Sequence, residues 1–386
     1  MTELVLEVER IIWRGRGLAR EPSGRVVILQ PGVYPGERVR AVIKREKKDY
    51  LQAEWTEILE PAEYRRPHPC SYSLECGGCR FGSIPNRVQL SLKQELLRSE
   101  LKRGLGPDLA RELPEEIRVF KSPKAWRYRW RGQVVVVDRK PHMMRLQSQD
   151  PVPVEDCLLL ASPLAKSLRE ASRRASPGRL TLAASPADGS VLCAGEQGSL
   201  RLPLPEFGLE IAVSAGDFFQ ANWGLNQELV HFVVHRVAGL DRVADLFAGT
   251  GNFALPAARK AGSVLALEGA SGAAACAAKS AGIYGLSNLT VKGCDFKRSD
   301  PAELLERFEP QALIVDPPRT GSGGLLQSLI RMESLQRLLW VSCDAVNSCR
   351  DLRRWLKSGW RVREVALFDM FPQTWHLEAV FVLEKR

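Results

Sequence analysis

The clearest pattern of apolar and polar positions in the chain lies between Arg242 and Glu268. An apolar run of strand length, Val243–Phe247, is followed by a turn with Gly249 and Gly251, a short helical pattern and a second apolar run. This order predicts a βαβ unit that has a glycine turn after its first strand and the carboxylate of Glu268 after its second. Glycines at such a turn let backbone N–H groups approach a ligand, and a strand-end acid suits ribose hydroxyl groups.

Further alternations of strand and helix patterns follow this unit toward the C-terminus. Alternating elements of this length predict a mostly parallel, doubly wound α/β sheet. The C-terminal edge of that sheet would collect the polar or glycine residues that follow its strands. These residues are Gly249, Glu268, Asp295, Asp316 and Cys343.

The glycine pattern by itself fits nicotinamide dinucleotide sites as well as S-adenosylmethionine sites. Two later stretches, Asp316-Pro317-Pro318-Arg319 and Val341-Ser342-Cys343-Asp344, each follow an apolar strand pattern. A hydride-transfer enzyme has no need of a cysteine at this edge, whereas a methyl donor paired with a thiol nucleophile does. The cysteine therefore favours methyl transfer.

The N-terminal segment, residues 1–61, consists of short alternating runs separated by turns. Several short strands in so few residues predict a small β-barrel of the OB type, which is a frequent nucleic-acid platform. The segment resembles the TRAM domain of several RNA-modifying enzymes. A barrel that only stabilises the protein is the alternative, although the basic run Lys44–Lys48 favours RNA. The predicted strands are Leu4–Ile12, Val26–Leu29, Glu37–Ile43 and Leu51–Ile58.

Three cysteines follow the barrel within ten residues, as Cys70-x5-Cys76-x2-Cys79. This spacing indicates a metal site that needs a fourth ligand, for which Cys157 is the best candidate. Four thiolates suit either Zn²⁺ or a [4Fe–4S] cluster, and the residue types alone do not choose between them.

Two further patterns in the middle of the chain admit more than one interpretation. Trp126–Arg131 alternates aromatic and arginine residues, which on a strand would put three of each on opposite faces. Those arginines would either face water or follow an RNA backbone. His231 and His235 lie four apart on a predicted helix, a spacing that could bind a metal. With valines and no acid between them, ordinary helix-face histidines are favoured.

Length, net charge and the N-terminal sequence limit the number of domains, the cellular location and the partners that we expect. The chain has 386 residues, a net charge of +10 and nine cysteines. Its length predicts two or three domains, and its charge favours nucleic acid over an anionic membrane as the partner. The charged N-terminus lacks the apolar core of a signal peptide, so we expect a cytoplasmic, monomeric protein with no membrane partner.

Methyl transfer to carbon 5 of a pyrimidine restricts which residues can take part. Carbon 5 of a pyrimidine is barely nucleophilic, but a thiolate that adds at carbon 6 turns the ring into an enolate that can accept a methyl group. A base must then remove the proton at carbon 5. Cys343 fits the first role, and Glu378 in the stretch Pro372–Glu378 fits the second.

The stretches DLFAGTGNF, DPPRTG, VSCD and FPQTWHLE, in this order, resemble those of RNA uracil-5 methyltransferases. The similarity covers nearly the whole chain and is closest to the subgroup that carries a [4Fe–4S] cluster and methylates uridine in 23S ribosomal RNA. It implies a TRAM-like barrel at 1–61, a central β-rich iron–sulfur domain at 62–213 and a Rossmann-like methyltransferase domain at 214–386. Ribosomal RNA is the expected substrate, and transfer RNA is the alternative.

The resemblance also implies a role for individual residues. Cys343 is the implied nucleophile and Glu378 the implied base, and Phe218 would stack on the target base with Gln220 beside it. The implied S-adenosylmethionine site comprises Gln220, Phe247, Gly249, Gly251, Asn252, Glu268, Asp295 and Asp316. The implied cluster ligands are Cys70, Cys76, Cys79 and Cys157.

Two features depart from the pattern of this family. Asp344 stands where asparagine is common, and Gly269–Ala273 lacks the usual polar helix start, so both could alter cofactor affinity. An RNA cytosine-5 methyltransferase is less favoured because its nucleophile usually follows a proline, whereas Ser342 precedes Cys343 here. A non-catalytic RNA-binding assembly factor is the remaining alternative.

Overall fold

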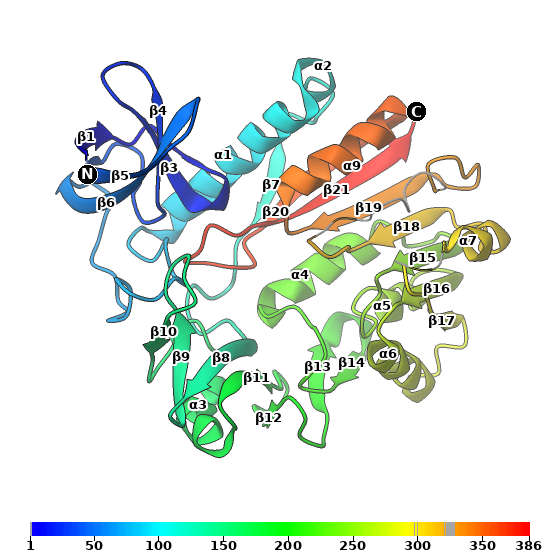
Figure 1. Ribbon diagram of the computed structural model, residues 1–386. Helices are drawn as coiled ribbons and strands as arrows, with labels where there is room; N and C mark the ends of the chain where they lie inside the picture. Colours follow the sequence, from blue (N-terminus) through cyan, green and yellow to red (C-terminus); the bar gives the residue numbers. More distant parts are fainter. Residues whose placement is uncertain (1, 297, 299, 320, 322–328) are drawn as a thin grey trace. The chain divides into compact units, whose positions relative to one another are not determined.

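The computed structural model describes residues 2–296, 298, 300–319, 321 and 329–386 (Figure 1). The chain forms two compact units, each built from segments that are distant in sequence. The first unit comprises Met1–Glu100, Met143–Val152 and Phe371–His376. The second comprises Leu101–His142, Pro153–Met370 and Leu377–Arg386.

The N-terminal part of the first unit is a six-stranded sheet with the strand order β1-β5-β6-β4-β3-β2. Alternate residues of its strands point into one apolar core that includes Leu6, Val27 and Val39. The strands are β1 (Glu3–Glu7), β2 (Arg10–Ile12), β3 (Arg16–Arg20), β4 (Val26–Leu29), β5 (Arg38–Glu46) and β6 (Tyr50–Glu60).

Two details of this sheet differ from the sequence prediction. The run Leu4–Ile12 is two strands rather than one, and a further strand that was not predicted begins at Arg16. The reversal occurs one step earlier, in the short helix η1 (Trp13–Gly15), where Arg14 and Gly15 have φ values of 68° and 67°. Because the chain has already turned there, β3 is free to pair with both β2 and β4.

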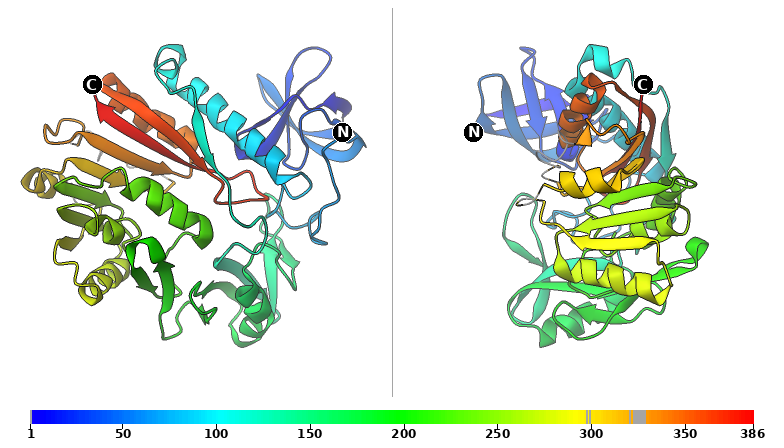
Figure 2. Two further views of the ribbon diagram at one scale, coloured as in Figure 1. Left: turned by 180° about the vertical axis from the view of Figure 1, so that it is seen from behind. Right: turned by 90° about the vertical axis from the view of Figure 1, so that its right-hand side faces the viewer.

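The second unit is organised around an eight-stranded sheet with the order β17-β16-β15-β18-β19-β21-β20-β7 (Figures 1 and 2). From β17 to β19 neighbouring strands are parallel, and β21 runs antiparallel to both β19 and β20. The doubly wound α/β prediction is therefore correct for this region. Its strands are β7 (Ile117–Phe120), β15 (Arg242–Leu246), β16 (Ser263–Glu268), β17 (Leu289–Gly293), β18 (Ala312–Val315), β19 (Arg337–Ser342), β20 (Trp360–Phe368) and β21 (Glu378–Lys385).

Strand order explains where a site can form in this sheet. The chain leaves β15 for β16 on one side and later returns to β18 on the other, so the loops after β15 and β18 diverge at the carboxyl edge. A crevice at such a switch point is the usual ligand site of doubly wound sheets. The central strands carry almost only buried apolar side chains, which gives this edge a rigid base.

Helices and smaller sheets complete the chain. A five-stranded sheet has the order β10-β9-β8-β11-β12, and β13 pairs with β14. The remaining strands are β8 (Arg131–Val137), β9 (Lys140–Met144), β10 (Pro151–Pro153), β11 (Gly178–Ala184), β12 (Val191–Cys193), β13 (Leu200–Leu204) and β14 (Leu209–Val213). The helices are α1 (Asn86–Leu105), α2 (Pro107–Ala110), α3 (Ser162–Arg174), η2 (Pro205–Phe207), α4 (Trp223–Val234), α5 (Ala254–Ala258), α6 (Ser271–Ile283), α7 (Ala302–Phe308) and α9 (Ala345–Lys357). Among the described residues, none of the helices combines the length and apolar character needed to cross a membrane.

The alternating stretch Trp126–Arg131 is not the strand that its pattern predicted. Only Arg131 belongs to a strand, and Arg127 has a φ of 57°, which breaks the twofold alternation of side chains. The guanidinium of Arg127 forms a paired contact with the carboxylate of Asp156, and the backbone N–H of Arg127 donates to the carbonyl of Leu158. The proposed row of three arginines on one face is therefore wrong, because this ion pair and the bent backbone separate them.

Candidate functional site

Pairing between β19 and β21 brings together the two residues predicted to do the chemistry. Ser342, the last residue of β19, lies opposite Ala379 in the antiparallel register. Cys343 directly follows β19 and Glu378 begins β21, so the register places them next to each other just beyond the end of the ladder. The carboxylate of Glu378 accordingly acts on the thiol of Cys343. Since the strands are buried on both sides, this register is strongly fixed.

The thiol of Cys343 lies in an environment that disfavours its charge. Burial raises its pKa to about 12, and the carboxylates of Glu378 and Asp316 act in the same direction. The guanidinium of Arg319 opposes them through its charge and a hydrogen bond to the sulfur. Arg319 is therefore the described group that favours the thiolate.

Two carboxyl groups share this buried region. Glu378 is 3% exposed, and its burial and the charge of Asp316 raise its pKa well above the ordinary value, while Arg319 lowers it. Burial also raises the pKa of Asp316 to about 7, partly offset by a hydrogen bond with the side chain of Gln220. Four predicted site residues, Cys343, Glu378, Asp316 and Gln220, thus lie in one cluster.

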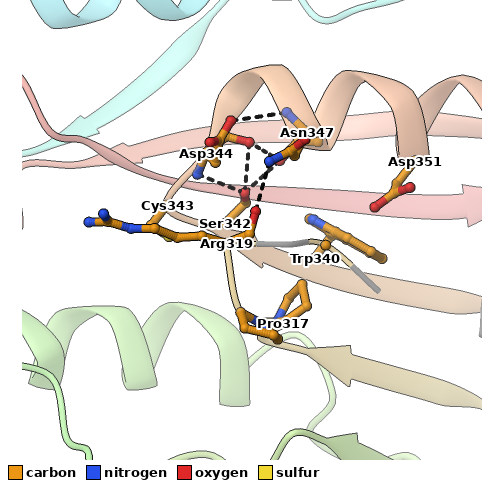
Figure 3. Close-up of a pocket in the computed structure, with 11 residues that line it drawn as sticks. Pro317, Arg319, Trp340, Ser342, Cys343, Asp344, Asn347 and Asp351 are labelled. Carbon is orange, nitrogen blue, oxygen red and sulfur yellow. Dashed lines mark hydrogen bonds between the residues drawn. The ribbon is translucent and has the colours of Figure 1, made fainter. Parts of the chain in front are cut away.

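A small pocket borders Cys343 at the end of β19 (Figure 3). It is lined by residues of the DPPR stretch, by the end of β19 and by the first turns of α9, and Asp351 lies at its far end. Arg319 stands in the DPPR motif, but no role was predicted for it, because its closeness to Cys343 depends on a contact between distant segments. Thr320 of the same motif lies outside the described residues.

The departure at Asp344 has a structural explanation. Its Oδ1 accepts hydrogen bonds from the backbone N–H groups of Val346 and Asn347, both at 3.0 Å, so Asp344 is the N-cap of α9. Its own N–H donates to Ser342 Oγ, which also accepts a 2.5 Å hydrogen bond from Ser348 Oγ. These bonds hold the backbone on both sides of Cys343, and an asparagine could make the same cap.

The glycine turn after β15 has the backbone geometry of a ligand site. Phe247, Gly249 and Gly251 have φ values of 61°, 56° and 92°. A non-glycine residue such as Phe247 rarely adopts this region, and such strain concentrates at functional sites. A Cβ added at Gly249 would meet no atom within 4 Å, so the space beside this backbone is open.

Glu268 joins the turn to the end of β16. Its Oε2 accepts from the N–H of Gly249 at 2.7 Å, and its Oε1 accepts from the N–H of Ala270 at 2.7 Å. The second bond explains how α6 begins at Ser271 without a side-chain cap in the small stretch Gly269–Ala273. The same carboxylate therefore organises both the glycine turn and the approach to α6.

The two remaining predicted cofactor residues of this region are Asn252, which directly follows the glycine turn, and Asp295. The amides of Asn252 and Asn226, a buried residue of α4 that was not predicted, make two reciprocal hydrogen bonds of 2.8 and 3.1 Å. Asp295 is half exposed after β17 and lies 3.7 Å from Arg298. Phe296, also missed from sequence, packs its ring 4.0 Å from that of Phe247.

Phe218 differs from its neighbours in the stretch before α4. Its side chain is 67% exposed, whereas Phe219 and Gln220 are buried. The guanidinium of Arg131 lies 5.8 Å from the centre of the Phe218 ring. An exposed aromatic ring beside a cation is a common arrangement for stacking on a nucleic-acid base.

Three of the four predicted metal ligands lie in one loop of the first unit. Cys70, Cys76 and Cys79 are half-buried, and Cys76 forms an isolated β-bridge with Arg145. The Nδ1 of His68 accepts from the N–H of Cys70 at 3.0 Å, and its Nε2 lies 3.0 Å from the carbonyl of Cys79. Cys157, the predicted fourth ligand, belongs to the second unit and is also half-buried.

Comparisons with known proteins point to uracil-5 methyltransferases, both for the C-terminal half and for nearly the whole chain. The sequence model of the family described as tRNA (uracil-5-)-methyltransferase matches residues 207–386. A 23S rRNA (uracil(1939)-C(5))-methyltransferase from Pseudomonas fluorescens is 30% identical, and the match covers 98% of this chain and 91% of that protein. A protein of the same name from Shewanella amazonensis is 29% identical over 99% of this chain and 96% of its own.

A solved structure supports the fold. The tRNA (uracil-54, C5)-methyltransferase of Pyrococcus abyssi, in complex with S-adenosyl-L-homocysteine, superposes with a TM-score of 0.72 at 19% identity. The superposition covers 98% of this chain and all of the other.

The cap of α9 makes a prediction for stability. Replacing Asp344→Ala removes the acceptor of two N–H groups and is expected to lower the free energy of unfolding by about 1 kcal/mol. Asp344→Asn keeps the acceptor and should cost less than about 0.5 kcal/mol. Urea unfolding followed by tryptophan fluorescence measures both, and an equal loss in the two variants would contradict the cap.

Asp316 makes a prediction for pH dependence. Its pKa of about 7 in the folded chain exceeds the value of about 3.9 expected when unfolded. The protonated form is thus favoured by folding, and the stability it brings is lost as the pH rises from 4 through 7. At pH 8, Asp316→Asn should be more stable than the wild type by roughly 1–4 kcal/mol, and at pH 4 the two should be nearly equal.

The control for this experiment is Asp138→Asn, which changes an exposed carboxylate in the turn between β8 and β9. Its stability should follow that of the wild type at every pH. A difference between wild type and Asp316→Asn that does not grow with pH would contradict the assignment.

Proposed function

The chain belongs to the RNA uracil-5 methyltransferase family, and we propose that it transfers a methyl group from S-adenosylmethionine to carbon 5 of a uridine in 23S ribosomal RNA. The observation that carries the mechanism is the adjacency of Cys343 and Glu378 at the sheet edge. Ribosomal rather than transfer RNA is supported by the relatives that match this chain over nearly its whole length.

The glycine turn fits the cofactor. Open space beside Gly249 admits a ligand close to the backbone, and the strand-end carboxylate of Glu268 suits the two hydroxyl groups of a ribose. Phe247 and Phe296 offer an apolar wall near the same turn. When bound, S-adenosylmethionine supplies an electrophilic methyl group and one positive charge.

Cys343 is the proposed nucleophile. Its sulfur, as the thiolate, forms a bond to carbon 6 of the uracil ring, and the electrons of the 5,6 double bond move into an enolate. Carbon 5 of the enolate would then bond to the methyl group of the cofactor as the bond between that methyl and the sulfonium sulfur breaks, which leaves a neutral thioether. Because burial keeps the pKa of the thiol near 12, the guanidinium of Arg319 has the task of stabilising the thiolate.

Glu378 is the proposed base for the last step. It removes the proton from carbon 5, the 5,6 double bond forms again, and the bond between carbon 6 and the sulfur breaks. A carboxylate with a raised pKa binds a proton more strongly, so the burial of Glu378 makes it a better base. Asp316 and Gln220, linked by a hydrogen bond, offer a donor and an acceptor to the polar edge of the ring.

The target uridine must leave its stack to reach this site, because the thiol lies within the folded chain. The exposed ring of Phe218 is the proposed stacking partner of the target or an adjacent base. Such a contact contributes about 1–3 kcal/mol per base.

The N-terminal sheet is the proposed second contact with RNA, as expected for a TRAM-like domain. A groove beside it is lined by Arg16, Lys44, three glutamines and apolar residues of the sheet. The glutamines, Gln30, Gln52 and Gln147, can donate to and accept from base edges, and the cations attract phosphates. Exposed Lys47 and Lys48 in the turn between β5 and β6 add charge to the same unit.

The cysteine loop fits a [4Fe–4S] cluster with thiolate ligands. The half-buried guanidinium of Arg80 interacts electrostatically with Cys76 and Cys79 and would balance the negative charge of a cluster. Cys70, Cys76 and Cys79, with Cys157 as the fourth, would hold it. Four thiolates also suit zinc, which makes the metal the point to test.

Methyl transfer tests the function directly. Purified protein with radiolabelled S-adenosylmethionine should form 5-methyluridine in transcripts of 23S ribosomal RNA and not in transfer RNA. Cys343→Ala should reduce the rate by at least about a thousandfold, because the ring is no longer activated. Cys349→Ala is the matched control, since this buried cysteine lies in α9 and has no assigned role. Labelling of transfer RNA alone would overturn the substrate, and full activity of Cys343→Ala would overturn the mechanism.

Glu378→Ala tests the order of the steps. Without the base the methylated adduct cannot release the thiol, so protein linked to RNA should accumulate on a denaturing gel. The double variant with Cys343→Ala should show no such band. A single variant that turns over without any adduct would count against Glu378 as the base.

The metal assignment has its own measurement. Protein purified without oxygen should be brown and contain about four iron and four sulfide ions per chain. Cys76→Ser should lose the colour, whereas Cys193→Ser, a cysteine outside the predicted ligand set, should keep it. A colourless protein that holds one zinc ion would contradict the cluster.

A further inference from the structure

A second cluster of metal-binding side chains lies apart from the residues discussed so far. Among the described residues, one group of three side chains of the types that bind metals has all its donor atoms within 4.8 Å of one another. It consists of Glu206 in η2 and of His231 and His235 on α4. The sequence showed the histidine pair with no acid between its members, and the structure adds Glu206, which η2 supplies before β14.

The contacts within this group are short and specific. The Nδ1 of His231 lies 2.9 Å from Glu206 Oε2, and the Nε2 of His235 lies 2.6 Å from Glu206 Oε1. The imidazole rings are neighbours with their centres 4.2 Å apart. The carboxylate therefore faces one nitrogen of each ring.

We infer that Glu206, His231 and His235 form a binding site for a divalent transition-metal ion such as Zn²⁺. Two imidazoles and one carboxylate are a donor set that zinc uses with a fourth, open position. At metal–ligand distances of about 2.0–2.1 Å, tetrahedral donors lie about 3.3 Å apart, so the side chains need only small rotations to admit the ion.

The surroundings favour a bound cation. His231 and His235 occupy the last turn and the C-cap of α4, where the helix carbonyl groups give a negative potential. The nearest guanidinium along the chain, that of Arg236, is paired with Glu364. The three side chains are 41–50% exposed, which leaves room for a water molecule as the fourth ligand.

A metal at this position would join η2, between β13 and β14, to the end of α4. Because the helix leads on to β15, the ion would stabilise the entry to the large sheet. Its role would be to tie η2 to the end of α4, and it is independent of the proposed methyl transfer. Loss of the metal should leave the rate of methylation unchanged.

Binding of Ni²⁺ is the test, because imidazole suits nickel as well as zinc, whereas thiolates such as those of the cysteine loop favour zinc. Calorimetric titration of the full-length protein should show one more bound ion than titration of His235→Ala. Glu206→Gln should lower the affinity for this ion. The loss should exceed the roughly tenfold to hundredfold that follows from removing a residue that only hydrogen-bonds to a metal ligand. The thermal unfolding midpoint of the wild type should rise with added ion, and that of the variants should not.

Two controls separate this site from other ligands. His142→Ala, which removes a half-buried histidine of β9, should bind as the wild type does. The cysteine loop is identical in all variants, so any ion that it binds cancels in the comparison. Equal stoichiometry and equal midpoints in wild type, His235→Ala and Glu206→Gln would overturn the inference. In that case the three residues would form only the hydrogen-bonded cluster.

Discussion

The antiparallel pairing of β19 with β21 is the constraint on which the proposed chemistry depends. It makes Cys343 and Glu378 neighbours although 35 positions separate them in the chain. The rest of the sheet serves this arrangement, because its buried strands fix the register and the cap of α9 fixes the backbone that follows the thiol. A slip of one residue would turn the two side chains to opposite faces.

This arrangement is electrostatically costly. A thiol and two carboxyl groups share a region of low polarity, where both carboxylates disfavour the thiolate and the charge of Asp316 also disfavours that of Glu378. One described guanidinium, that of Arg319, offsets them. The free site therefore favours the neutral forms of these groups, so both the thiol of Cys343 and the carboxyl group of Glu378 must lose a proton before they can act. Such a site reduces stability in exchange for reactivity, a common relation in enzymes.

Much of this could be predicted from local patterns. The strand, glycine turn and strand-end acid between Arg242 and Glu268 form as predicted, because hydrophobic periodicity and glycine conformation act over a few residues. Contacts between segments that are distant in the sequence could not be predicted in this way. Glu206 beside His231 and Asn226 beside Asn252 depend on how helices pack, and no short-range pattern reveals them. The strand prediction for Trp126–Arg131 was wrong for the same reason. There Arg127 pairs with Asp156, 29 positions away, and the alternating pattern does not decide the backbone conformation.

The covalent bond between Cys343 and the uracil ring is the central claim, and trapping it is its most direct test. RNA that carries 5-fluorouridine at the target position cannot release the thiol, because the base would have to remove fluorine rather than a proton. After digestion with trypsin and nuclease, mass spectrometry should find the methylated fluorinated nucleotide on the peptide Leu338–Arg350. Fragment ions should assign it to Cys343 and not to Cys349. A stable RNA complex without this modification, or a modification on another cysteine, would contradict the account.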